Sequence, residues 1–262
     1  ASYSGSAADG NPGLLMLGSV SAVAAPQDFE FSELPAGVRT AGLPFGVAIR
    51  ARNVAGATTP NFALEGETLS LTHRRHSPTA AGAVDGSLGV GAPVLNAGTL
   101  RYATVAWSEV GRIDLDARLS SASYLGSGFD VQGSTGAAGA LGPFRPNHLR
   151  LLASEACGSF SYAGQPFQVM VSARNAADAL TLNYFHAGVG TSYARDLSFS
   201  DGGAPALGLG SLAPTTLAAS AFSAGEASTA LSYAFTSKAS GPGTLSLRVS
   251  DADGVSSAAF AG

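Results

Sequence analysis

The sequence GLPFGVAIRARNVAGATTPNF at residues 42–62 returns 122 positions later as GQPFQVMVSARNAADALTLNY at residues 164–184. The two stretches align without a gap, and 11 of their 21 positions are identical. A repeat of about 120 residues has the size of one β-sandwich module. The chain is therefore predicted to contain the same structural unit twice. Tandem units of this kind usually build a length of surface protein rather than an active site.

Within both copies, apolar side chains occupy every second position, which is the pattern of a half-buried strand. They are Phe45, Val47, Ile49 and Ala51 in the first copy and Phe167, Val169, Val171 and Ala173 in the second. Helical periodicity is nearly absent from the chain. Further strands are predicted over 67–73, 99–107, 111–119, 228–236 and 243–250. We predict an all-β fold made of two tandem immunoglobulin-like antiparallel β-sandwiches.

The boundaries of these sandwiches follow from a change in composition. Residues 126–142 carry six glycines in 17 positions and few side chains that could pack. We interpret this segment as a linker with hinge freedom, unless it packs as an extra strand, or as a long loop that ends in the next strand. The predicted organisation is an N-terminal extended segment at 1–24, a first sandwich at 25–125, a Gly-rich linker at 126–143 and a second sandwich at 144–262.

The first 24 residues need a separate interpretation. An apolar run followed by Ala22-Val23-Ala24 is similar to a secretory signal, but neither Lys nor Arg precedes it, so we expect a mature or excised product. Residues 13–24 are predicted to form an extended strand. If this strand completed a sheet in a neighbouring molecule, the chain would be a fibre subunit joined by strand addition. The candidate residues for strand exchange are Leu15, Leu17, Val20 and Ala22.

Composition narrows the functional classes. Only 12% of the residues are charged and the net charge is −4, so electrostatics does not favour nucleic acid or an anionic membrane as a partner. No stretch reaches the ~18–20 apolar residues that a membrane-spanning helix requires. Cys157 is the only cysteine, which leaves either a half-buried structural thiol or a bond to a cysteine outside this segment.

The repeated positions suit a strand, a turn and a returning strand. The Pro-Phe pair fits a strand start, because Pro needs no ladder N–H there and Phe anchors the core. The first Asn ends the strand and can bond its own turn, and the second Asn begins the return. Since both copies keep the whole set, we interpret it as architecture. The structural-motif residues are Pro44, Phe45, Asn53 and Asn61 in the first copy and Pro166, Phe167, Asn175 and Asn183 in the second.

Candidate chemistry is sparse. The chain has four histidines and no G-x-S-x-G, H-E-x-x-H, P-loop or dinucleotide fingerprint, so we expect no catalytic residue, no cofactor and no metal. The densest basic cluster, His73, Arg74, Arg75 and His76, is predicted to lie at a hairpin tip. It is interpreted as a solvated loop, with contact to an anionic glycan or a protein partner as the alternative.

Two other features have structural and functional interpretations. Asp251-Ala-Asp253-Gly254 is similar to the opening of a calcium loop but lacks the remaining oxygen ligands, so an Asp-Gly turn is predicted. Trp107 is the sole Trp and is predicted to be a core residue. The alternative is that it stacks on a sugar in a carbohydrate-binding module.

Several runs occur in a fixed order along the chain. They are Trp107–Gly111, Tyr124–Gly126, Gly142–His148, Cys157–Phe167, Ala173–Asn175 and Thr181–Tyr184. This series resembles the C-terminal region of MshQ-like proteins, which are associated with biogenesis of the MSHA type IV pilus. The resemblance implies an extracellular or envelope-located, pilus-associated β protein without assigned catalysis.

These observations converge on a non-catalytic structural or adhesive module of a bacterial surface or pilus-associated protein. The expected location is extracellular or at the cell surface. The expected partners are proteins, a further copy of the chain or a glycan, with neither nucleic acid nor a membrane span. The alternatives are the self-assembling fibre subunit and the carbohydrate-binding module.

Overall fold

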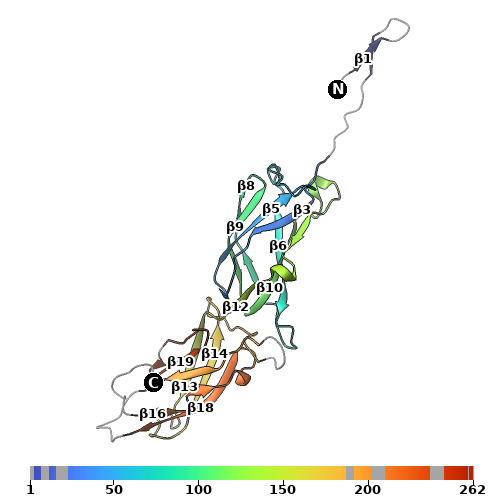
Figure 1. The fold of residues 1–262 in the computed structure, drawn as a ribbon. Helices are drawn as coiled ribbons and strands as arrows, with labels where there is room; N and C mark the ends of the chain where they lie inside the picture. The colour runs from blue at the N-terminus through green and yellow to red at the C-terminus, as the bar shows by residue number, and fades with distance from the viewer. Residues whose placement is uncertain are drawn as a thin grey trace.

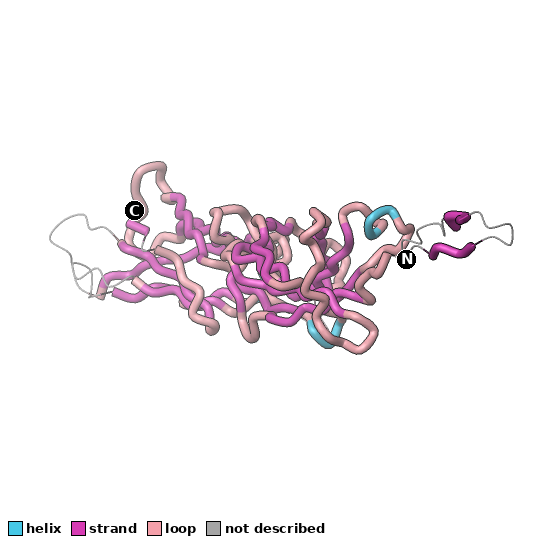
Figure 2. The backbone as a smooth tube through the Cα atoms, turned by 90° about the horizontal axis from the view of Figure 1, so that it is seen from above, coloured by secondary structure: helices cyan, strands magenta, loops and turns pink. Residues whose placement is uncertain are grey.

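The computed structural model describes residues 3–6, 12–15, 23–186, 192–201, 210–236, 245–258 and 260–261. Its regular structure is nearly all β-strand, which confirms the predicted all-β class. The helical turns of the described residues are η1 (Tyr124–Gly126), η2 (Ala137–Gly139) and η4 (Ala219–Ala221). Figures 1 and 2 show an elongated molecule, with residues 28–145 in one half and the strands from residue 148 onward in the other.

Two sheets around one core form the first half, called here the N-terminal sheet pair. One sheet has the strand order β3-β5-β9-β7, with β8 also on β9, and the other has the order β11-β10-β12-β4, with β6 also on β10. All these pairings are antiparallel except the short one between β12 and β4. The bounds are β3 Asp28–Glu33, β4 Arg39–Thr40, β5 Phe45–Arg52, β6 Leu69–Ser77, β7 Leu88–Val90, β8 Pro93–Asn96, β9 Thr99–Trp107, β10 Gly111–Leu119, β11 Gln132–Ser134 and β12 Leu141–Arg145.

The second half, called the C-terminal sheet pair, is built in the same way. Its sheets have the strand orders β13-β14-β18-β16 and β17-β15-β19-β20, and all their pairings are antiparallel. Each sheet pair encloses its own cluster of buried apolar side chains. The bounds are β13 His148–Ser154, β14 Phe167–Arg174, β15 Leu197–Ser200, β16 Gly210–Ala213, β17 Thr216–Leu217, β18 Glu226–Phe235, β19 Ser246–Asp251 and β20 Phe260–Ala261.

The repeated stretch forms the equivalent strands β5 and β14 in the two halves. The side chains predicted to face the core are buried in both strands, including Phe45 at 6% exposure and Phe167 at 8%. Arg52 lies on the opposite face of β5, where its guanidinium group pairs with Asp28 at 2.7 Å. It therefore serves its own sheet rather than the packing between the two halves.

The other predicted strands agree with the structure to different degrees. Predicted strands 99–107 and 111–119 coincide with β9 and β10, and 228–236 coincides with β18 to within two residues. The strand predicted at 243–250 is β19, of which residues 243 and 244 lie outside the described residues. The strand predicted at 67–73 is β6, which continues through Ser77.

The predicted linker over 126–143 is wrong, because this segment completes the N-terminal sheet pair. β11 and the first residues of β12 pair with β10, and Val131 and Leu141 are buried at 1% and 2% exposure. The glycines serve close packing here. A Cβ on Gly133 would lie 1.9 Å from the carbonyl oxygen of Phe29 in the facing sheet. The N-terminal sheet pair therefore runs to Arg145 instead of ending near residue 125.

The N-terminal segment begins with a small hairpin. β1 (Tyr3–Ser6) pairs with β2 (Pro12–Leu15) in an antiparallel two-stranded sheet, in which Leu15 lies opposite Tyr3. The strand predicted over 13–24 is therefore observed only as far as Leu15. The other candidates for strand exchange, Leu17, Val20 and Ala22, lie outside the described residues.

We expect Gly98→Ala to destabilise the N-terminal sheet pair strongly. Gly98 has φ +75°, and a Cβ there would lie 2.0 Å from the carbonyl oxygen of Thr59. The left-handed backbone alone costs about 1–2 kcal/mol for a non-glycine residue, and the clash adds to this cost. Urea unfolding would measure the loss of stability. Gly56→Ala is the matched control, because Gly56 has φ +76° and nothing within 4 Å of its Cβ position. Equal losses in the two variants would contradict the clash.

Candidate functional site at the junction between the sheet pairs

The most elaborate polar network lies where the two sheet pairs meet end to end (Figure 1). The N-terminal sheet pair contributes a turn, a loop and a strand end, and the C-terminal pair contributes the turn after β14 and the chain that follows it. This region is called the junction below. Its main segments are Ala41–Gly42, residues 78–86 and Trp107–Val110 from the first half, and Asn175–Ala176, Thr181–Tyr184 and Tyr193 from the second.

Glu109 is the central residue of the junction. It follows β9 at the end of the N-terminal sheet pair and is only 4% exposed. Its Oε1 accepts the N–H of Leu182 at 3.0 Å, and its Oε2 accepts the N–H groups of Asn183 at 3.1 Å and Val110 at 3.3 Å. Burial raises the pKa of the Glu109 carboxyl above its usual value, against the opposite effect of these N–H donors. The carboxyl group thus ties the two halves together by satisfying their backbone.

The second Asn of the repeated motif makes a paired contact across the junction. The Asn183 amide accepts the Val84 N–H at 2.8 Å and donates to the Val84 carbonyl at 2.9 Å. This arrangement imitates one rung of a β-ladder. Asn183 is 0% exposed, so both hydrogen bonds are shielded from water.

The first Asn of the motif stabilises its own turn and also forms a hydrogen bond across the junction. Asn175 Oδ1 accepts the N–H groups of Ala177 and Ala179, which holds its own turn. Its Nδ2 donates to the Ser108 carbonyl of the other half at 3.0 Å. The prediction that this Asn bonds its own turn is confirmed, and the contact across the junction is an addition.

Backbone and apolar contacts close the junction. The Ala176 N–H donates to the Ala41 carbonyl at 3.0 Å, and a Cβ on Gly42 would lie 3.0 Å from that same Ala176 nitrogen. The Val110 side chain belongs to the buried cluster of the C-terminal sheet pair although its residue follows β9. The first half therefore contributes the Val110 side chain to the core of the C-terminal sheet pair.

The basic cluster supports the junction from inside the first half. His73, Arg74, Arg75 and His76 belong to β6 and pair with β10, so the prediction of a hairpin tip is wrong. The strand continues because β10 supplies a partner along its whole length. Arg75 Nε lies 2.9 Å from Asp85 Oδ1, and His73 Nε2 lies 2.8 Å from the Asp85 carbonyl oxygen.

Trp107 holds the same loop in place. Its ring N–H donates to the Asp85 carbonyl at 2.8 Å, and its side chain is 0% exposed. The core prediction for Trp107 is thus confirmed, and a buried ring cannot stack on a sugar. Gly86 follows Asp85 and lies close to the Trp107 ring. A Cβ at Gly86 would lie 2.9 Å from Trp107 Nε1, so a larger residue would not fit there. Contacts with Trp107, His73 and Arg75 therefore hold the loop that places Val84 beside Asn183.

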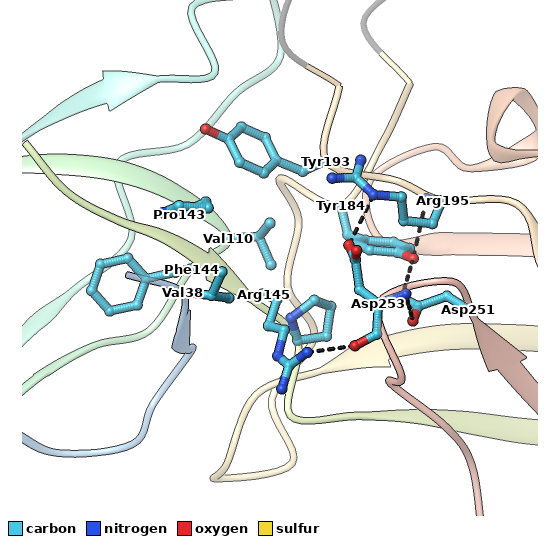
Figure 3. A pocket seen from close by; sticks show the side chains of 11 residues that line it. Val38, Val110, Pro143, Phe144, Arg145, Tyr184, Tyr193, Arg195, Asp251 and Asp253 are labelled. Atoms are coloured by element: carbon cyan, nitrogen blue, oxygen red, sulfur yellow. Dashed lines mark hydrogen bonds and ion pairs between the residues drawn. The ribbon is translucent and has the colours of Figure 1, made fainter. Parts of the chain in front are cut away.

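A pocket of about 150 Å³ opens beside the junction (Figure 3). Arg195 pairs with Asp253 at 2.9 Å, and Arg145 donates to the Asp253 carbonyl at 2.5 Å. The Tyr184 hydroxyl contacts Asp251 Oδ2 at 3.3 Å, and burial raises its pKa. Arg195 and Asp253 thus form an ion pair, whereas Arg145 binds a backbone carbonyl and Asp251 contacts the Tyr184 hydroxyl. The pocket is lined by Val38, Val110, Pro143, Phe144, Arg145, Pro146, Tyr184, Tyr193, Arg195, Asp251 and Asp253.

The predicted Asp-Gly turn lies at the edge of this pocket. Asp251 Oδ1 accepts the N–H groups of Asp253 and Val255, and Gly254 has φ +80°. Within the described residues, no group of three or more His, Cys, Asp or Glu side chains is placed to hold a metal ion. Cys157 lies elsewhere, as an exposed free thiol rather than a half-buried one.

The two copies of the motif have different environments. Pro44 and Pro166 directly precede β5 and β14, and the Phe residues that follow them are buried. The second copy brings Asn175 and Asn183 into the junction. Asn53 and Asn61 of the first copy are exposed and follow the end of β5 that points away from the junction.

The sequence interpretation missed three residues of the junction: Glu109, Val84 and Tyr193. The Tyr193 hydroxyl lies 2.6 Å from Ser77 Oγ across the junction. Of the three, only Glu109 had a signal in the sequence, since it lies inside the Trp107–Gly111 run. A carboxylate directly after a buried strand is unusual unless it has partners.

Comparison with known proteins identifies a family and solved structures that are similar to this chain. The structure of the adhesin InvE of Yersinia pseudotuberculosis aligns over 87% of this chain and 56% of that chain, at 15% identity and a TM-score of 0.34. The chain thus spans less than two thirds of InvE, and so low a TM-score does not establish a common fold. No curated protein matches the chain significantly.

A family model, described as DUF6701, third domain, matches residues 109–261. The match begins at Glu109, takes in β10 to β12 of the N-terminal sheet pair, and covers the whole C-terminal sheet pair. It thus includes Glu109 and the junction segments of the C-terminal sheet pair, and it covers more than half of the chain. The chain belongs to the DUF6701 family.

Proposed function

We propose that the chain is a non-catalytic structural or adhesive module of a bacterial surface or pilus-associated protein, built from two tandem immunoglobulin-like sandwiches. The observation that carries this proposal is the buried junction. Glu109 and Asn183 are almost without solvent contact, and their polar atoms are satisfied by backbone groups of the opposite half. Such a junction suits a segment that must keep a fixed direction under load.

The same network argues for a mechanical rather than a catalytic role. A general acid, base or nucleophile needs access to a substrate. At the junction, the Glu109 carboxylate and the Asn175 and Asn183 amides already form hydrogen bonds with backbone groups. These bonds hold the two sandwiches in one orientation. We accordingly propose that the chain is not an enzyme.

The surface location rests on sequence features. The ordered motif runs resemble MshQ-like proteins, and the low charge content is common in secreted and surface β proteins. Proteins at the cell surface are then the proposed partners. None of the helices in the described part of the chain has the length and apolar character of a membrane span.

We expect the two sheet pairs to hold one fixed orientation in solution and Asn183→Ala to release it. Asn183 joins Val84 by two buried hydrogen bonds, so the substitution leaves both backbone groups without partners. Small-angle X-ray scattering would report the change as a broader distribution of overall dimensions. Asn61→Ala is the matched control, because the equivalent Asn of the first copy is exposed and its side chain makes no hydrogen bond to another residue that the structure describes. A wild-type profile that requires many bent conformers would refute the rigid spacer.

The location has its own test. An antibody against the purified chain should label intact bacteria that carry the gene, without permeabilisation. Labelling that appears only after permeabilisation would overturn the surface assignment.

A further inference from the structure

The repeated motif is buried at one place in the molecule and open at another. At the junction, Asn175 and Asn183 are 3% and 0% exposed. Their counterparts Asn53 and Asn61 are exposed and follow the C-terminal end of β5, the end of the strand away from the junction turn at Gly42. This far end is called the upper end below. In the second copy of the motif, this surface packs against the N-terminal sheet pair. In the first copy, the equivalent surface is exposed.

The upper end keeps the donors that the junction uses. At the junction these are the Nδ2 of Asn175, the amide of Asn183 and the N–H of Ala176. Their counterparts are the Nδ2 of Asn53, the amide of Asn61 and the N–H of Val54. None of these three groups makes a hydrogen bond to another described residue. Asn53 Oδ1 still holds its turn through Ala55 and Ala57, so the Nδ2 is presented as it is in Asn175.

Apolar side chains accompany these donors. Val54, the counterpart of Ala176, is 88% exposed, and Leu64 in the same loop region is 70% exposed. A partner that covered Val54 and Leu64 would remove their apolar surface from water, which favours association. The partner must therefore offer backbone carbonyls and apolar surface.

The C-terminal sheet pair offers both at its free end, called the lower end. Ala163-Gly164 repeats Ala41-Gly42, and both glycines have φ +79°. The Gly42 N–H donates to the Trp107 carbonyl at 2.7 Å, and the Gly164 N–H donates to the Tyr233 carbonyl at 2.7 Å. Ala41 is 0% exposed because the junction covers it, whereas Ala163 is exposed. The exposed rings of Phe160 and Tyr162 flank this turn on its N-terminal side.

The hydrogen bond between Glu109 and Leu182 at the junction has no polar counterpart at the upper end or at the lower end. At the junction, Glu109 accepts the N–H of Leu182. The counterpart of Leu182 is Pro60, which has no N–H to give. The Tyr233 carbonyl accepts the Gly164 N–H as the Trp107 carbonyl accepts the Gly42 N–H, so Tyr233 is equivalent to Trp107. Two residues further along, the counterpart of Glu109 is Phe235. The donor is lost at the upper end and the carboxylate at the lower end, which turns a polar contact into an apolar one.

We propose that the upper end of one molecule docks onto the lower end of a second copy, in the arrangement that the junction shows within one chain. The contact joins two different surfaces, so it does not close a dimer and continues into an open head-to-tail filament. It uses sandwich ends and needs no exchange of the N-terminal segment. The inference goes beyond the proposed function, since a rigid spacer need not associate with itself.

The test uses two variants of the whole chain, each of which blocks one end. Val54→Glu places a charge on the upper end, and Ala163→Glu places one on the lower end. In sedimentation experiments from about 10 µM to about 1 mM, the range of weak protein contacts, the average mass of the wild-type protein should rise with concentration. Each variant alone should remain monomeric. An equimolar mixture of the two should form a dimer and no larger species, because each partner retains one open end.

Val90→Glu is the control, since Val90 is also exposed but lies on β7, at neither end. It should associate like the wild-type protein. A wild-type chain that stays monomeric over the whole range overturns the proposal, as does a mixture of the blocked variants that forms no dimer. Both outcomes would leave the rigid junction and the surface location untouched, because those are measured on the monomer and on intact cells.

Discussion

Trp107→Ala should lower the free energy of unfolding of the N-terminal sheet pair by about 3–5 kcal/mol, the usual cost of removing a large buried aromatic ring. The ring is 0% exposed and packs edge-on against Phe144, with centroids 5.1 Å apart. It also donates to the Asp85 carbonyl. The substitution thus removes core volume and frees the loop that carries Val84 to the junction.

Denaturant unfolding followed by circular dichroism would measure this loss. Trp107→Phe is the control, because it keeps most of the ring and removes the N–H donor. It should cost less than the Ala variant, and the remaining loss reflects the smaller ring and the missing hydrogen bond to the Asp85 carbonyl, which His73 Nε2 still contacts. A Trp107→Ala protein as stable as the wild type would show that the ring lies outside the core.

The all-β architecture was predictable because it depends on the spacing of apolar residues along short stretches of sequence. Phe45, Val47 and their counterparts in β14 occupy every second position of their strands, and a strand with this periodicity is recognised from its sequence alone. The repeat then predicts that the unit occurs twice. Both features depend on neighbours in sequence, which a single chain reveals.

The linker and the basic cluster were misjudged for one physical reason. Glycine is required both in flexible segments and where two backbones approach closely, and only the facing chain distinguishes the two cases. Gly133 lies against Phe29, more than 100 residues away. Likewise, His73–His76 reads as a charged loop until β10 is seen to pair with it.

The different environments of the two motif copies could not be predicted at all. Asn61 and Asn183 have matching sequence neighbours, yet one is exposed and the other is completely buried. What differs is the presence of Val84 and Glu109, which approach Asn183 from the other sheet pair. A motif that builds the same turn in both copies thus gains a second role only where a partner surface meets it.

Glu109→Ala should weaken the junction more than any other single polar substitution there. It leaves the N–H groups of Leu182 and Asn183 buried without acceptors, at about 1–3 kcal/mol for each unsatisfied group. We expect the C-terminal sheet pair to unfold independently at lower denaturant concentration, so that one transition becomes two. Glu33→Ala is the control, because that carboxylate is 57% exposed and its ion-pair partner is Arg101 on the same sheet. A single unshifted transition for Glu109→Ala would contradict the role of the carboxylate.

The protonation of Glu109 gives the junction a pH dependence of defined sign. Burial raises its pKa in the folded protein above 4.5, so the folded state holds the proton to higher pH than the unfolded state does. The contribution of Glu109 to stability is then complete below about pH 4.5 and declines as the pH rises through the raised pKa. Glu109→Gln cannot titrate and serves as the reference. The stability advantage of the wild-type protein over Glu109→Gln should therefore narrow with rising pH. If it widened instead, the three backbone N–H groups would outweigh burial, and the junction would favour the ionised carboxylate.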